Sequence, residues 1–232
     1  MKPKKQWNAM LLGLGFLCLS SAHAAEPGWY IVAFGGESSA SGLSVNQSEE
    51  NLVALFDSVG LDVVAVDSTL DDSDTGFGLA GGYQLNDHFA FEFAYVDLGA
   101  AGSRHSATIT DGVEQSDADV QFESSADGAV VSALGILPIG ERFSVFGRVG
   151  LSFMSATGTA RITIDGDTQR ASQSSQKTDP VIGIGAEYSL SKHFAVRLAW
   201  DRYMDVGTQD VTGNIDADLL TLGIRMGVGW FR

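Results

Sequence analysis

The stretch HFAVRLAW, residues 193–200, decides the fold, because its side chains alternate strictly in character. One face holds Phe194, Val196, Leu198 and Trp200, and the other holds Ala195, Arg197 and Ala199. Alternation with a period of two is the pattern of a β-strand. A strand with one face in bulk water would carry several polar residues on that face. The stretch therefore predicts a strand with a large apolar face and a small-residue face that holds a single charge.

This stretch belongs to a window that the chain uses twice. YSLSKHFAVRLAW (188–200) and YQLNDHFAFEFAY (83–95) are identical at six of thirteen positions. Where the first window has Arg197, the second has Glu92. Each window is interpreted as one hairpin that passes through a tight turn, and a third, diverged version surrounds Pro138 to Phe146.

Six further segments show the same alternation or a short apolar run, which gives eight predicted strands. Their spans are 28–37, 75–86, 88–99, 127–138, 142–156, 180–190, 193–204 and 218–231. Only the first has an unclear facing, because residues 29–34 are apolar on both sides. Small residues with one charge per strand suit the inside of a narrow closed barrel, which side chains just fill at eight strands. The sequence therefore predicts an all-β fold, an eight-stranded antiparallel up-and-down transmembrane β-barrel whose apolar face meets lipid.

The connections between these strands alternate between short and long. Residues 86–88, 138–142 and 191–193 are short, whereas 38–74, 100–126, 157–179 and 205–217 are long. Short periplasmic turns and long outer loops are typical of outer-membrane barrels. Residues 51–67 of the first long connection are unusually apolar. They could extend the strands, form a short helix or dock on a partner, and we favour a strand extension or a packed cap.

Two sets of side chains follow from this facing. The aromatic girdle expected at the membrane interfaces is Tyr83, Tyr95, Tyr188, Trp200 and Trp230. The interior charge cluster is Glu92, Arg148, Glu187, Arg197 and Arg225. Glu92 and Arg197 lie on opposite strands of the predicted barrel, so we expect them to meet across the lumen. The cluster is expected to fill and rigidify the interior, and a gate for a small pore is the functional alternative.

The first residues predict a secretory signal peptide at 1–24. Three lysines precede an apolar run, and a small-x-small site, Ala22-His23-Ala24, follows. We expect a single barrel domain at 25–232. The only cysteine of the chain, Cys18, lies in the predicted signal peptide. The formal net charge of −15 makes nucleic acid an unsuitable partner.

The quoted hairpins and the C-terminal DADLLTLGIRMGVGWFR resemble the transmembrane domain of the outer membrane protein A (OmpA-like) family. The resemblance covers the chain from Gly28 onward. It implies an interior Glu and Arg/Lys network, whose positions are matched here by Glu92, Arg148, Glu187 and Arg197. The chain ends at Arg232, after the penultimate Phe231, so we expect no peptidoglycan-binding domain.

No catalytic or metal site is expected. His105 lies beside Ser106 but without the third group of a nucleophilic arrangement. His88 and His193 fall in turns, and the acidic run at 71–74 lacks the spacing of a calcium loop. We therefore expect neither an enzyme nor a cofactor.

The expected protein is a structural component of the bacterial outer membrane, a monomer that displays acidic loops outward. Its expected surroundings are outer-membrane lipid and lipopolysaccharide. Two alternatives stay open. One is a surface adhesion or binding module that contacts ligands through loops 38–74 and 100–126, and the other is a small-solute channel gated by the interior Glu/Arg cluster.

Overall fold

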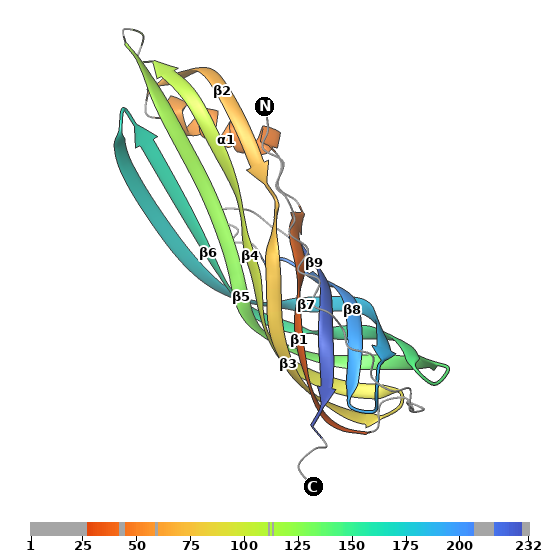
Figure 1. The fold of residues 1–232 in the computed structure, drawn as a ribbon. Coiled ribbons are helices and arrows are strands. Elements are labelled where there is room, and N and C mark those ends of the chain that lie inside the picture. Colours follow the sequence, from red (N-terminus) through yellow and green to blue (C-terminus); the bar gives the residue numbers. More distant parts are fainter. Residues whose placement is uncertain are drawn as a thin grey trace, which may run out of the picture.

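The computed structural model describes residues 27–41, 45–58, 60–110, 112, 114–206 and 216–228. In these residues the chain forms nine strands and one helix (Figure 1). They are β1 (Gly28–Ser41), α1 (Val45–Ser58), β2 (Asp62–Asp71), β3 (Ser73–Asn86), β4 (Phe89–Thr110), β5 (Gln115–Ile139), β6 (Phe143–Ile164), β7 (Asp167–Ser189), β8 (Phe194–Tyr203) and β9 (Asp216–Gly227). No helix in these ranges is both long enough and apolar enough to cross a membrane.

Eight of the strands close into an antiparallel barrel, which confirms the predicted fold class. Once β2 is set aside, each strand pairs with its neighbour along the chain, and β1 pairs with β9 to close the ring. The predicted signal peptide at 1–24, Trp230 and the C-terminal Phe231 and Arg232 lie outside the described residues.

The three predicted short turns are present at one end of the barrel. β3 gives way to β4 across residues 87–88, β5 to β6 across 140–142, and β7 to β8 across 190–193. Short turns mark the periplasmic end of an outer-membrane barrel, so the opposite end is extracellular.

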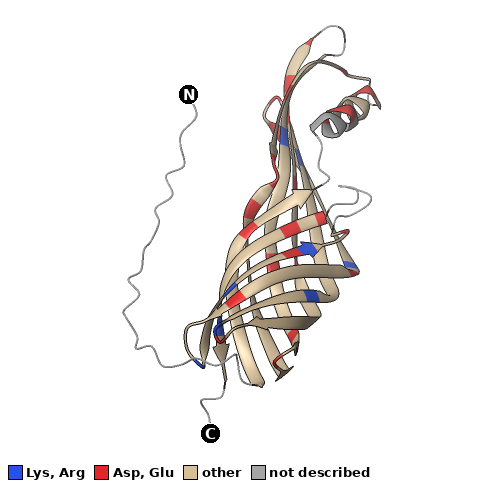
Figure 2. Cartoon of the chain, turned by 90° about the vertical axis from the view of Figure 1, so that its right-hand side faces the viewer, with Lys and Arg blue, Asp and Glu red and all other residues tan. Residues whose placement is uncertain are grey.

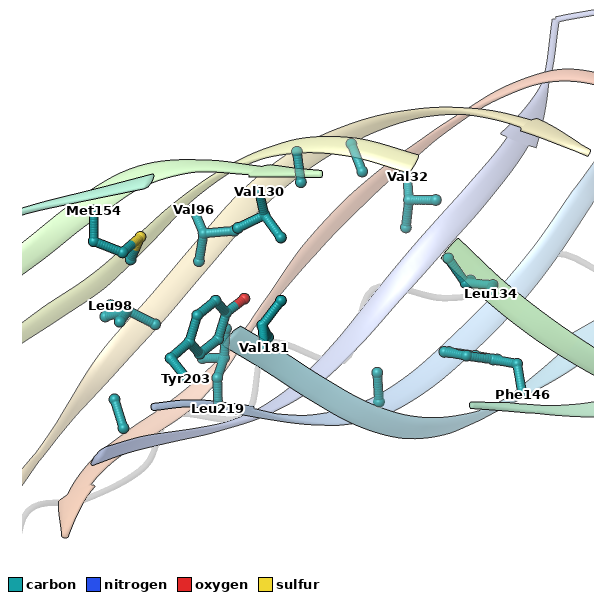
Figure 3. Close-up of a cluster of buried hydrophobic side chains, with 14 of the residues drawn as sticks. Val32, Val96, Leu98, Val130, Leu134, Phe146, Met154, Val181, Tyr203 and Leu219 are labelled. Carbon is teal, nitrogen blue, oxygen red and sulfur yellow. The ribbon is translucent and has the colours of Figure 1, made fainter. Parts of the chain in front are cut away.

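Alternating side chains line the two surfaces of the barrel wall. Large apolar residues on the outside stay exposed, among them Phe91, Phe93 and Leu222, because this surface meets lipid. A cluster of buried side chains fills the inside (Figure 3), with Val32 and Phe146 among its members. The ambiguous first strand turns Tyr30 and Val32 inward and Trp29 and Ile31 outward.

The prediction that residues 100–126 and 157–179 form outer loops is wrong, because both segments are mostly strand. β4 and β5 stay paired out to Thr110 and Gln115. β6 and β7 stay paired out to Ile164 and Asp167, across a two-residue turn. That turn is Asp165-Gly166, with φ of 48° and 89°, the left-handed pair that a tight hairpin requires. The outer face of these strands meets water and carries polar residues, so they lack the large apolar outer face of the barrel strands.

The first long connection contains both a helix and a strand. β2 pairs with the distal part of β4, from Asp71 opposite Gly102 to Asp62 opposite Thr110. The pairing of β4 with β3 stops before this part, at Asp97. Leu52 and Phe56 of α1 are buried against Ile109 and Val120 in a second hydrophobic core. The apolar segment 51–67 is therefore partly helix, partly strand, and packs as a cap.

We call the described parts of residues 45–71, 100–125 and 156–178 the extracellular extension. It consists of α1, β2 and the distal parts of β4, β5, β6 and β7. Figure 1 shows these strands continuing past the barrel with α1 against them. The extension has its own core, so it is an ordered part of the fold.

Closure of the barrel depends on a glycine in β1. Gly36 is opposite Thr221 of β9, and a Cβ at Gly36 would overlap the carbonyl oxygen of Leu220. We expect Gly36→Ala to lower the free energy of unfolding by about 1–3 kcal/mol, as overpacking does. Urea titration followed by the mobility difference between unboiled and boiled protein measures this loss. Gly35→Ala is the matched control, because its Cβ would lie 3.7 Å from the nearest atom, the Gly76 carbonyl oxygen. Equal losses in both variants would contradict a steric cause.

Candidate functional site

The barrel lumen holds a network of charged side chains that the strands deliver from different sides. The inward-facing positions of β4, β6, β7, β8 and β9 each contribute one predicted member. In strand order these are Glu92, Arg148, Glu187, Arg197 and Arg225. The structure brings all five together in one connected group.

Glu92 is the centre of this network. Its Oε1 lies 2.6 Å from Arg197 Nη1, and its Oε2 lies 2.7 Å from Arg148 Nη2. Tyr30 donates its hydroxyl proton to Glu92 Oε1 over 2.8 Å. Only 1% of the Glu92 side chain is exposed, so two arginines compensate a carboxylate that water scarcely reaches. Because Glu92 comes from β4 and Arg197 from β8, the pair spans the lumen.

The remaining members extend the network to both sides. Arg197 donates from Nε and Nη2 to Glu187 Oε1, each over 2.5 Å. Arg225 donates to Gln84 Oε1 over 2.6 Å and lies 3.9 Å from Glu187. Its guanidinium carbon also lies 4.0 Å from the centroid of the Tyr30 ring. This geometry is a favourable cation–π arrangement.

Three members were not predicted from the sequence: Asp201, Tyr30 and Gln84. Asp201 Oδ2 lies 2.6 Å from Arg148 Nη1 and gives the network three acids and three bases. Asp201 is four positions beyond Arg197 on the same face, so extending the alternation past Trp200 would have found it. Tyr30 had no such signal, because β1 is apolar on both faces.

This arrangement can block the lumen but leaves space below it. A small cavity of about 10 Å³, room for about one water, lies between the network and the periplasmic turns. Its lining includes Gln84, Phe146, Arg197 and Arg225. The network therefore crosses the lumen on one side of this cavity.

The girdle aromatics that the structure describes lie on the outer surface. Tyr83 and Tyr188 lie near the periplasmic turns, whereas Tyr95 and Trp200 lie further along their strands. Tyr83 packs edge-to-face on Trp29, which the sequence had not assigned, with ring centroids 5.0 Å apart.

His105 lies in the extracellular extension and not in the lumen. Its Nδ1 is 2.8 Å from Ser68 Oγ, and its Nε2 is 3.0 Å from Ser103 Oγ. Ser106, the neighbour considered from sequence, is on the opposite face and donates to Asp119 Oδ1 over 2.7 Å. Because His105 is only 1% exposed, a substrate has no path to its ring. The described residues also contain no group of three or more His, Cys, Asp or Glu that could hold a metal ion.

His105 is expected to make the extension sensitive to acid. Burial lowers the pKa of His105 below its ordinary value, although the nearby Glu49 opposes this shift. The unfolded extension, with a histidine pKa of about 6.5, therefore takes up a proton first as the pH falls. We expect the extension to lose stability between pH 7.5 and 5.5, seen as faster amide hydrogen exchange in α1 and β2. The barrel part of β4 serves as the internal control. A His105→Phe variant with the same pH dependence would contradict this assignment.

The comparisons with known proteins agree with this architecture. The family model of the OmpA-like transmembrane domain matches residues 25–230. The chain belongs to this family. It is an integral β-barrel protein of the bacterial outer membrane, as the sequence predicted.

Curated relatives of this OmpA-like barrel are longer than the matched region. It is 27% identical to outer membrane protein A of Yersinia pseudotuberculosis serotype I (strain IP32953) over 155 residues, 66% of this chain and 40% of that protein. It is 26% identical to outer membrane protein A of Serratia marcescens, over 66% of this chain and 39% of that protein. The alignments thus span about two fifths of the relatives' length.

Solved structures with a similar fold include two small outer-membrane proteins. Neisserial surface protein A matches with a TM-score of 0.42 and 16% identity, over 86% of this chain and 96% of that one. OprG from Pseudomonas aeruginosa matches with a TM-score of 0.42 and 15% identity, over 90% and 99%.

Proposed function

We propose that this OmpA-like barrel is a structural outer-membrane protein that displays an ordered, acidic extracellular extension for contact with surface ligands. The observation that supports this most is the second hydrophobic core, in which Leu52 and Phe56 fix α1 on the sheet. A connection that served only to link two strands would not need a core of its own. The extension also includes most of the two segments, 38–74 and 100–126, that the sequence indicated as ligand-binding loops.

The charge network supports the structural part of this proposal. It links β4, β6, β7, β8 and β9 by ion pairs through Glu92, Glu187 and Asp201. These ion pairs between strands make the barrel a rigid base for the extension. The closed barrel has no free strand edge in the membrane, which favours a monomer surrounded by lipid and lipopolysaccharide.

Separating the barrel from the extension tests the proposal. A variant in which short turns replace residues 42–72, 100–125 and 156–178 is expected to keep its heat-modifiable gel mobility. In cells that lack the native chain, this variant should restore detergent resistance as the full chain does. It should not restore attachment of the cells to surfaces coated with polysaccharide or matrix protein. Full attachment by the shortened barrel would overturn the display function.

A small-solute channel is the second candidate, and the position of the Glu92–Arg197 pair across the lumen favours it, because a gate would lie there. The small cavity beside the network is lined in part by Glu187, Arg197 and Arg225. If the network is a gate, Arg197→Ala should raise conductance in planar bilayers. An unchanged recording would remove this candidate and leave the structural one.

A further inference from the structure

Three arginines of the extracellular extension lie in a single row across neighbouring strands. Arg104 of β4 is opposite Gln121 of β5, Gln121 is opposite Arg161 of β6, and Arg161 is opposite Arg170 of β7. Directly opposed residues of antiparallel strands share a face of the sheet. We call Arg104, Arg161 and Arg170 the arginine row.

The row lies on the face that α1 does not cover. Its neighbours along the strands, His105 and Val120, point to the other face and are buried there. The three arginines are all exposed. In the part of the chain that the structure describes, none of them forms an ion pair or a side-chain hydrogen bond. The row is therefore a set of positive charges without an ion-pair partner in the described chain, although the extension around it has twelve acidic and only four basic residues. Figure 2 shows how few basic segments there are among the acidic ones.

This placement costs stability within the protein. Neighbouring strands are about 4.7–4.9 Å apart, and like charges directly opposite one another are unfavourable. The other cross-strand pairs on this face of the β6–β7 hairpin are uncharged hydroxyls that contact each other. They are Thr157 with Ser174 at 3.1 Å, Thr159 with Ser172 at 3.5 Å, and Thr163 with Thr168 at 3.0 Å. Arg161 and Arg170 thus interrupt a hydroxyl ladder with a like-charge pair, and neither forms an ion pair in the described chain.

The chemistry of this face suits a ligand with several sulfate or phosphate groups. Guanidinium groups form paired, charge-assisted hydrogen bonds with such groups, and the flanking hydroxyls add neutral donors. From Arg104 to Arg170 the row crosses three strand spacings, about 14 Å, which is too long for one small anion. Asp119 and Glu123 of β5 flank the row on either side, so they confine a polyanion to the line of the arginines. More distant acids are screened, because the Debye length is about 8 Å at physiological ionic strength.

The height of the row decides where this ligand comes from. Asp97 is the last residue of β4 that pairs with β3, and Arg104 is seven positions further on. At about 3.3 Å per residue the row lies about 23 Å further along the strand. The phosphates of the bilayer itself lie at the membrane surface, below this level. We propose that the arginine row binds a sulfated or phosphorylated polysaccharide outside the membrane. This inference rests on the display function proposed above and gives that function a class of ligand.

The test measures binding of the full chain in neutral-lipid nanodiscs to immobilised heparin, with neutral dextran as the blank. Arg161→Gln/Arg170→Gln should weaken binding at least tenfold, and Arg170→Gln alone should weaken it severalfold. Lys177→Gln is the matched control, since it removes one charge from the same strand. Lys177 is already paired with Asp205 at 3.2 Å, so its loss should leave binding within twofold. Unchanged gel mobility and unchanged hydrogen exchange in α1 show that each variant is folded.

Three results would overturn the inference: no binding of the full chain to heparin, equal weakening by Arg170→Gln and Lys177→Gln, or loss of heparin binding when lipopolysaccharide is added to the nanodisc. The last result would mean that the phosphates of the membrane already occupy the row. Attachment of cells distinguishes this inference from the display function. If attachment needs the extension but not the arginines, only the polysaccharide assignment fails.

Discussion

Replacing Glu92 with glutamine is expected to lower the free energy of unfolding by about 3–5 kcal/mol, the cost of removing one partner of a buried ion pair. The substitution keeps the shape of the side chain but removes the charge that Arg148 and Arg197 share, at 2.7 and 2.6 Å. Both arginine side chains are less than 10% exposed, so water cannot replace the carboxylate. Urea titration of the refolded barrel in lipid vesicles, followed by tryptophan fluorescence, measures the loss.

Glu123→Gln is the control for this prediction. Glu123 is exposed on β5 in the extension and belongs to no ion pair in the described chain. A surface change of this kind should alter the free energy of unfolding by no more than about 0.5 kcal/mol. If Glu92→Gln fell within the same range, the network would contribute nothing to the stability of the barrel.

The barrel was predictable from the sequence because its two surfaces make opposite demands. Lipid requires apolar side chains at every second position, and the narrow lumen admits only small residues or compensated charges. Phe91, Glu92 and Phe93 show both demands within three residues. Only the facing of β1 could not be predicted in this way. Tyr30 and Trp29 are both aromatic, although Tyr30 faces the lumen and Trp29 faces lipid.

The extension was not predictable in the same way, because its strands meet water instead of lipid. In residues 168–175 of β7 both faces carry Thr, Gln, Arg, Ala or Ser, so no apolar alternation marks this part of the strand. The pairing there depends on backbone hydrogen bonds and on the Asp165-Gly166 turn. The arginine row was invisible for a related reason. Arg104 and Arg161 are 57 positions apart in the sequence, and only the register of β4, β5 and β6 places them in line.

The charges of the lumen were partly predictable, and the part that was missed has a physical cause. A charge in the middle of an apolar strand stands out, so Glu92 and Arg197 were evident. Asp201 lies towards the end of β8, where charged residues also occur on the outer face, such as the partly exposed Arg202. Near the membrane surface a charged side chain can reach water from either face of the strand, so the charge by itself does not show which face it is on. The face then has to be inferred from the alternation of side chains alone.

Arg197→Leu is expected to destabilise the barrel by about 3–5 kcal/mol, whereas Val196→Leu should have almost no effect. The first change leaves Glu187 with Arg225 alone, at 3.9 Å, and removes one of the two ion pairs of Glu92. The second change enlarges an apolar side chain on the lipid side of β8. Both variants add a leucine at adjacent positions, so they differ chiefly in the face that they change.

A double variant separates lost pairing from altered packing. Glu187→Leu/Arg197→Leu removes both partners of one ion pair, so its loss should be smaller than the sum of the two single losses. The coupling is expected because Arg197 contacts Glu187 through two nitrogens, each at 2.5 Å from Oε1. Additive losses would mean that Arg197 stabilises the barrel by filling space and not by pairing. Equal losses for Arg197→Leu and Val196→Leu would mean that the two faces of β8 meet the same surroundings, which a closed barrel in lipid does not allow.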